Sequence, residues 1–211
     1  MPAGRPRLQE GNLPSICLES PDPLRMTGWF RVWMANHFGS SATIENPVLQ
    51  NFVWNADPKQ TQIAIESSSS WNPQVVEFRP SIIIKRGGWQ NLKFGINNRM
   101  MGNIPGKPGI TAYANYWQGS HTLFVCAGED GECELLAREV FRELNQNGQR
   151  LQTLLGMFKF AVTEVGEMGK LEEASENFVV PINVAYVLEE AWFIEDEGPL
   201  IKKLDLAMLT P

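Results

Sequence analysis

The chain has 211 residues, of which 43% are hydrophobic and 20% charged, so it can bury the core of one moderate-sized domain. No apolar run approaches the roughly 20 residues of a membrane-spanning helix, and the first residues lack a secretory signal. Three cysteines are too few for a disulfide scaffold. These features predict a soluble protein made in the cytoplasm, with no membrane partner.

The net charge of −6 is unevenly distributed along the chain. Residues 1–100 hold 10 Lys or Arg against 7 Asp or Glu, whereas residues 101–211 hold 8 against 17. Acidic surfaces repel the phosphates of nucleic acids and membranes. The second half of the chain is therefore not expected to bind duplex DNA.

Residues 1–19 are polar, rich in Pro and Gly, and without hydrophobic periodicity, so we expect an extended N-terminal arm. Residues 20–211 are expected to form a single domain. In residues 23–38 the apolar side chains recur at helical spacing, with Asp22 as a candidate N-cap and Gly39 as a terminator. His37 falls in the last turn of this helix, where a capping or core role is favoured over catalysis.

Residues 61–67 alternate as a strand, and "RPSIIIKRGG" (79–88) indicates an inner strand buried on both faces and ended by Gly87 and Gly88. Residues 89–118 contain many Gly and Asn residues and predict a projecting loop or hairpin that binds a partner. A plain surface hairpin is the alternative. The candidate interface residues of the arm and this segment are Arg5, Arg7, Trp89, Phe94, Arg99, Met100, Met101, Tyr116 and Trp117.

The stretch "SHTLFVCAGEDGECELLAREV" (120–140) predicts a central strand, a tight turn and an amphipathic helix that Asp130 caps and Gly148 ends. The expected buried stripe of the helix consists of Cys133, Leu136, Ala137, Val140, Phe141 and Leu144. The residues expected to face solvent are Glu132, Glu134, Arg138, Glu139, Arg142 and Glu143.

Two alternating segments follow, residues 157–166 and 176–196, and we expect them to pair as antiparallel strands. The longer one carries Phe178, Val180, Ile182, Val184, Tyr186 and Leu188 on one face. Residues 199–209 are expected to form a final strand or a docking tail. The predicted fold class is α+β, with a mixed, largely antiparallel β-sheet flanked by α-helices.

No catalytic or cofactor-binding constellation is recognisable in the sequence. Cys126 and Cys133 are six residues apart and lack the second ligand pair that a zinc site commonly uses, so core packing is favoured over a metal or thiol site. His37 and His121 are the only histidines available to a catalytic triad, and both have structural interpretations. We therefore expect no enzymatic activity, no metal and no cofactor.

The order of elements resembles the tail terminator proteins of long-tailed bacteriophages, within the wider group of phage neck and tail-completion proteins. The resemblance rests on "RPSIIIKRGGW", "GSHTLFVCAGEDGECELLAREVFREL" and "KFAVTEVGEMGKLEEASENFVVPINVAYVLEEAW", and covers residues 79–195. It implies a non-enzymatic protein of the virion neck that forms a homo-oligomeric ring, usually a hexamer. The ring would cap the tail tube protein and meet a head-side connector or stopper protein, while DNA passes through without sequence-specific binding.

An acidic channel would let DNA slide without sticking, because fixed contacts to phosphates would impede ejection. The candidate lumen residues are Glu164, Glu167, Glu172, Glu173 and Glu176.

Three other interpretations of the sequence stay open. The chain could be a different neck protein, such as a head-completion adaptor or stopper, since the arm and residues 89–118 are additional to many family members. It could be a small cytosolic enzyme that uses Cys126, Cys133 or His121. It could also bind DNA, because "AGRPRLQ" (3–9) partly resembles a minor-groove hook built on an Arg-Gly-Arg-Pro core.

Overall fold

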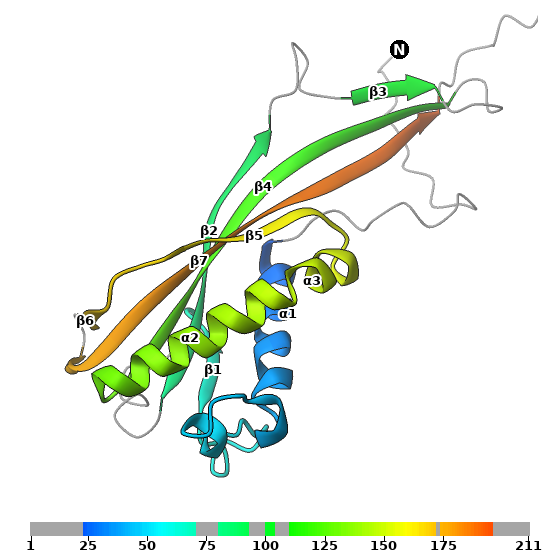
Figure 1. Cartoon of the computed structure of the whole chain (residues 1–211). Coiled ribbons are helices and arrows are strands. Elements are labelled where there is room, and N and C mark those ends of the chain that lie inside the picture. The colour runs from blue at the N-terminus through cyan, green and yellow to red at the C-terminus, as the bar shows by residue number, and fades with distance from the viewer. Residues whose placement is uncertain (1–22, 71–79, 93–99, 104–109, 172–173, 196–211) are drawn as a thin grey trace, which may run out of the picture.

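The fold is one mixed β-sheet with helices packed against one face (Figure 1). The computed structural model describes residues 23–70, 80–92, 100–103, 110–171 and 174–195. Seven strands form the sheet in the order β1-β2-β4-β7-β5, with β3 paired to β4 and β6 paired to β7. All pairs are antiparallel except β1 with β2, which confirms the predicted α+β class with a mixed, largely antiparallel sheet.

Two long central strands run the length of the molecule. Strand β4 (Ile110–Ala127) has 18 residues and β7 (Ala174–Glu195) has 22, and they pair from Ile110 opposite Glu195 to Ala127 opposite Phe178. The predicted beginning of β4 at residue 120 is therefore wrong. Residues 111–114 and 116–119 pair with a strand on both sides, and residues 112–118 are only half-buried, so this part of the sequence lacks the apolar alternation of a core strand.

Strand β2 (Ser81–Leu92) confirms the predicted inner strand but extends beyond its predicted end. Ile82 and Ile84 enter the main core, while Ile83 joins a smaller cluster with Cys126 on the other face. Gly87 and Gly88 do not end the strand, because they lie at a register shift between Arg86 and Trp89. Glycines at such an irregularity let the backbone bend while the ladder continues.

Helix α1 (Pro23–His37) confirms the first predicted helix, and its Met26, Phe30 and Met34 are fully buried against the sheet. Two short 3₁₀ helices follow, η1 (Ser41–Thr43) and η2 (Leu49–Asn51). Strand β1 (Ala64–Ser67) then lies parallel to β2. The candidate cap Asp22 lies outside the described residues.

Helix α2 (Asp130–Gln146) packs on the same face as α1 and buries most of the predicted stripe. The N-cap of this helix was predicted wrongly. Glu129, not Asp130, occupies the N-cap position, and Asp130 instead accepts a hydrogen bond from the Gly131 N–H at 2.7 Å. Helix α2 ends at Gln146, just before Gly148, as predicted, but Gly148 also begins a second helix, α3 (Gly148–Leu154), which the sequence pattern did not predict.

Two side chains of α2 lie on the other side from the one predicted. Phe141, assigned to the buried stripe, is 36% exposed. Glu139, assigned to the solvent face, is only 3% exposed because α1 and the chain after it cover that flank of α2 and supply polar partners. Helical periodicity places a residue on a face but does not reveal which second helix covers its flank.

Strand β5 (Met157–Val165) lies at the sheet edge and is antiparallel to β7, as predicted. Strand β6 (Gly169–Leu171) occupies part of the predicted connection. The predicted inward face of β7 is confirmed, with Val180, Ile182, Val184, Tyr186 and Leu188 buried and Phe178 packed against them. The predicted arm (1–19) and the segment 199–209 lie outside the described residues.

No helix within these described ranges is both long and apolar enough to span a membrane.

Candidate assembly surfaces

The first candidate surface is an aromatic platform where β2, β4 and β7 run side by side. The rings of Trp89 and Trp117 stack with their centroids 6.1 Å apart, and Trp89 lies 6.0 Å from Tyr186. The Trp117 indole N–H donates to the Glu190 carboxylate at 2.7 Å. The platform continues the core face of the sheet toward the end of the molecule that the helices do not cover (Figure 1).

Gly119 makes this platform possible because it leaves room for two rings. A Cβ atom at this position would lie 2.5 Å from the Trp89 ring and 2.6 Å from the Tyr186 ring. Both residues flank Gly119 in the sheet register, one on each neighbouring strand. The aromatic rings therefore occupy the space that a side chain would fill.

The structure brings two of the predicted interface residues together here, and a third, Tyr116, immediately precedes Trp117 in β4 and therefore lies on the opposite face of the sheet. Trp89 and Trp117 stack, and Tyr116 makes an edge contact with Phe158 at 5.1 Å. The backbone of β3 (Met100–Asn103) pairs with β4, which places Met100 opposite Ala114 and Met101 opposite Tyr113. The remaining candidates, Arg5, Arg7, Phe94 and Arg99, lie outside the described residues.

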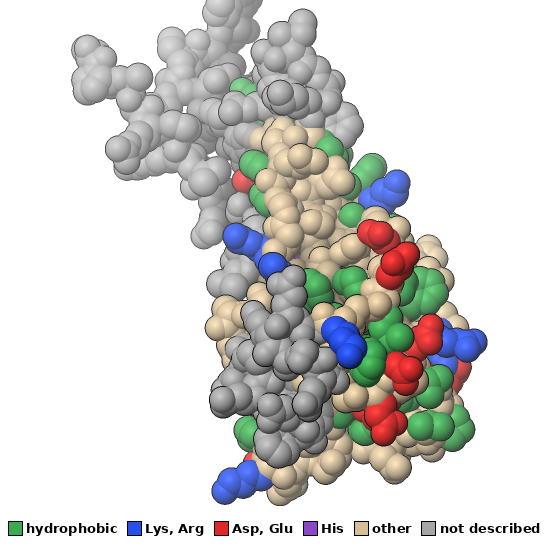
Figure 2. All heavy atoms as spheres, turned by 90° about the vertical axis from the view of Figure 1, so that its left-hand side faces the viewer, with side chains coloured by type: hydrophobic (Ala, Val, Ile, Leu, Met, Phe, Trp, Pro, Cys, Tyr) green, Lys and Arg blue, Asp and Glu red, His purple; other side chains and the backbone are tan. Residues whose placement is uncertain are grey.

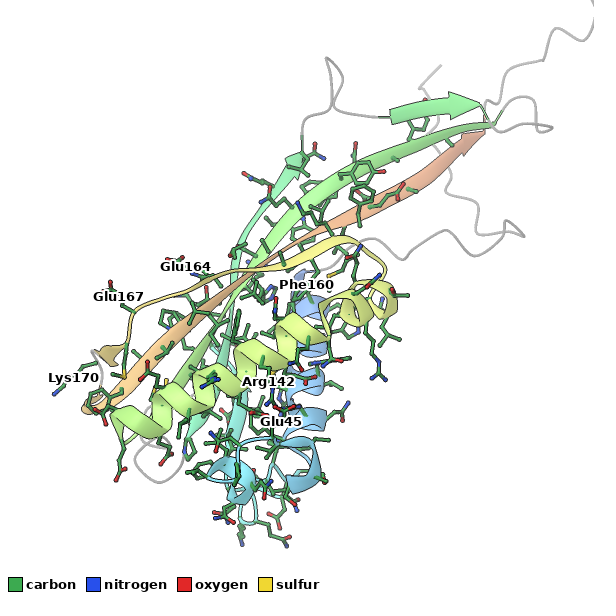
Figure 3. The ribbon with its side chains drawn as sticks, viewed as in Figure 1. Glu45, Arg142, Phe160, Glu164, Glu167 and Lys170 are labelled. Atoms are coloured by element: carbon green, nitrogen blue, oxygen red, sulfur yellow. The ribbon has the colours of Figure 1, made fainter. Side chains whose placement is uncertain are left out.

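The second candidate surface is the acidic edge along β5. Glu164 and Glu167 are exposed on this edge (Figure 3), and Glu164 accepts a hydrogen bond from the Asn183 side-chain amide at 3.0 Å. Viewed from the left of Figure 1, acidic side chains alternate with exposed hydrophobic ones (Figure 2). Glu172 and Glu173 lie outside the described residues, and Glu176 is described only as a backbone position in β7.

The third candidate surface is a groove between α2 and the connection from β5 to β6. It has a volume of about 680 Å³, and we call it the α2–β5 groove. Three large apolar side chains line it while remaining exposed, namely Phe141 (36%), Val165 (46%) and Met168 (42%). The groove has no signature in the sequence, because its walls come from segments that are contiguous only in the folded chain.

His121 lies in the core rather than at a surface, and both ring nitrogens have partners. Its Nε2 is 2.8 Å from the Thr27 hydroxyl, and its Nδ1 is 2.9 Å from the Tyr186 hydroxyl. Burial, together with the positive charge of Arg86, lowers the pKa of His121 to about 4. His121 is therefore neutral near pH 7 and links α1 to the two central strands.

His37 lies in a second polar cluster, between α1 and α2. Its Nε2 is 3.1 Å from the Glu139 carboxylate and its Nδ1 is 3.1 Å from the Glu143 carboxylate. Burial lowers the pKa of His37, but hydrogen bonds and charges from Glu143 and Glu139 outweigh burial and leave the pKa above its ordinary value. Arg142 completes the cluster by pairing with Glu139 at 2.6 Å and with Glu45 (Figure 3).

Cys126 and Cys133 are both fully buried. Burial raises the pKa of Cys126 to about 12 and that of Cys133 to about 11. The Cys133 thiol donates to the Val125 carbonyl at 3.3 Å. The thiolate form, which is the reactive one, is thus strongly disfavoured at neutral pH.

Within the described residues, no group of three or more His, Cys, Asp or Glu side chains is placed to hold a metal ion. The polar networks of the core join α1 to α2 and to the sheet. Half-buried aromatic and exposed apolar surfaces are of the kind through which proteins contact other chains. Comparison of this chain with protein-family models and with curated proteins finds no match.

Proposed function

We propose that this chain is a structural protein of the neck of a tailed bacteriophage, a tail terminator whose copies form a ring. The ring caps the tail tube and joins it to the head-side connector. The protein is made in the host cytoplasm and becomes part of the virion. The observation that supports this proposal best is the extension of the sheet beyond its helices.

This extension consists of β3 together with the outer ends of β2, β4 and β7 (Figure 1). A narrow ribbon of strands is marginally stable in water unless something packs on it. Trp117 and Tyr116 are nevertheless only half-buried on this ribbon. Half-buried aromatic residues on a ribbon of strands without a covering helix favour burial against another protein chain, such as a second copy in a ring or the tail tube protein.

The charge distribution supports a role in DNA passage. Glu164 and Glu167 expose carboxylates on one edge of the sheet, in the half of the chain that carries 17 acidic residues. If that edge faces the lumen, every copy adds negative charge to the channel wall. Such a wall repels phosphates and lets DNA move through without fixed contacts.

The proposal is tested by light scattering of the purified protein and by negative-stain imaging after incubation with tail tubes. We expect rings, or density at one end of each tube. Trp117→Ala should reduce capping, whereas Trp54→Ala, which removes a half-buried indole remote from the extension, should leave capping intact in the folded fraction.

Tubes that stay uncapped at a large molar excess of the protein would overturn the tail terminator proposal. Binding of the same sample to the connector of DNA-filled heads would then identify an adaptor or stopper instead.

A further inference from the structure

We propose that the α2–β5 groove binds the C-terminal segment, residues 199–209, of a second copy of this chain. This inference rests on the proposed function only in that both require copies to associate. It names the contact between neighbouring copies and can be tested without tail tubes.

The groove has the chemistry of a binding site for an apolar segment. Its floor is formed by Ala137 and Val180, which are 3% and 4% exposed. Phe141, Val165 and Met168 form its walls and remain exposed. Single exposed apolar side chains are common, but several that converge on one groove mark an interaction site.

The C-terminal segment has matching apolar content. Its sequence, "PLIKKLDLAML", contains six large aliphatic side chains: Leu200, Ile201, Leu204, Leu206, Met208 and Leu209. The N-terminal segment 1–22 contains only four Leu or Ile residues after Met1, and they are separated by prolines and polar residues. Residues 199–209 are therefore the better apolar match among the terminal segments.

The charges of the groove and the segment are also complementary. Glu134 and Glu167 line the groove with two carboxylates, and Arg138 adds one cation. The segment carries Lys202, Lys203 and Asp205. The groove thus offers two anions and one cation to a segment with two cations and one anion, a pattern that favours a defined register.

The reach of the chain indicates that the beginning of the segment lies in the groove of a different copy. Val165, in the groove, pairs with Ile182, whereas β7 continues to Glu195 at the opposite end of the molecule (Figure 1). That stretch of strand spans about 43 Å at the usual rise of a β-strand. Five further residues lead to Leu200 and span at most about 18 Å. The first apolar residues of the segment therefore cannot return to their own groove, but they can enter a neighbour's.

Cysteine cross-linking of full-length variants tests the contact. In a Cys17→Ser background the native Cys126 and Cys133 are buried, so only introduced thiols react. Mixing Met168→Cys protein with Leu206→Cys protein in the presence of a mild oxidant, such as oxygen with copper phenanthroline, should give a disulfide-linked heterodimer. Val48→Cys is the matched control, because Val48 is an exposed aliphatic residue (63%) that does not line the groove. The Met168→Cys mixture should yield about tenfold more product or better, because docking raises the effective thiol concentration.

A charge exchange tests the register. Glu167→Lys should lower the yield of the Met168→Cys and Leu206→Cys product several-fold, and Lys202→Glu with Lys203→Glu in the partner should restore it. All these positions in the groove are exposed, so a folding defect is not expected.

A yield equal to that of the Val48→Cys control, with and without tail tubes, would overturn the inference. Preferential linking of Met168→Cys to Leu13→Cys would also overturn it, because the N-terminal segment would then be the occupant. If rings cap the tubes but Met168→Cys and Leu206→Cys form no disulfide above the control, the proposed function stands and this contact is excluded. If this disulfide forms but the tubes stay uncapped, the contact stands and the tail terminator proposal is excluded.

Discussion

His37 and His121 are both buried, yet their neighbours shift their pKa values in opposite directions. The carboxylates of Glu139 and Glu143 face His37 from α2, with Arg142 and Glu45 behind them, so the charged imidazolium is favoured. Two neutral hydroxyl groups face His121, with Arg86 near, so the neutral ring is favoured. The two residues should therefore contribute to stability with opposite dependences on pH.

For His37, the folded-state pKa lies above the unfolded value of 6.5. Its stabilisation is therefore complete below pH 6.5 and is lost as the pH rises through the folded pKa. His37→Gln should lower the free energy of unfolding by about 2–4 kcal/mol at pH 6, because Glu139 loses a buried partner. Urea denaturation at pH 6 and pH 8 measures the gap between wild type and variant. A gap that widens toward pH 8 would contradict the assignment.

For His121, the folded-state pKa of about 4 lies below the unfolded value of 6.5. Its stabilisation is complete above pH 6.5 and is lost as the pH falls through about 4. His121→Phe should cost about 1–3 kcal/mol at pH 7, because the Tyr186 hydroxyl loses its partner in the core. The same variant should lose less stability than wild type between pH 6.5 and 4. Equal acid sensitivity of the two proteins would show that His121 does not titrate on unfolding in this range.

At the scale of elements, β2, β4 and β7 lie side by side at Gly119, and this glycine sets how closely the aromatic rings pack on the sheet. Trp89 and Tyr186 occupy the space above this glycine. Their contact connects the helix-covered part of the sheet to the extension. A side chain at residue 119 would displace these two rings.

Gly119→Ala should therefore lower the free energy of unfolding by about 1–3 kcal/mol through overpacking. Gly88→Ala is the matched control, because a Cβ atom at Gly88 would meet nothing within 4 Å. Urea denaturation of both variants measures their stability. Equal stability of the two variants would show that the rings move aside without loss.

The helices and strands also show where sequence patterns succeed. Helix α1, helix α2 and the inward face of β7 follow from apolar periodicity, because each presents one face to the same core. The sequence pattern predicts a strand end at Gly87 and Gly88, where the structure has a bulge, because glycine weakens a strand whether the strand stops or bends. The register of the neighbouring strand decides between these outcomes.

At the scale of the whole molecule, the sheet has one part covered by helices and one extension of β-strands (Figure 1). Among the described residues, no helix covers the extension, and residues 112–118 are only half-buried. Regions of low local packing open more readily than the core.

Amide hydrogen exchange should therefore be faster in residues 110–118 and 189–195 than in residues 120–127 of the free protein. Ring formation or binding to tail tubes should slow exchange in the extension and leave the core unchanged. If exchange in the extension of the free protein is as slow as in its core, the extension does not need a partner to be stable.

The sequence by itself determined the α+β class, the position of most core elements and the structural role of both described cysteines, because periodic apolar burial is a local property of the chain. It also singled out Trp89, Tyr116 and Trp117 by composition. Only the tertiary structure decided that Trp89 stacks on Trp117, that Glu139 is buried, and that Phe141 and Met168 line one groove. These relations depend on strand register and on which helix covers which flank, and both are contacts between residues far apart in the chain.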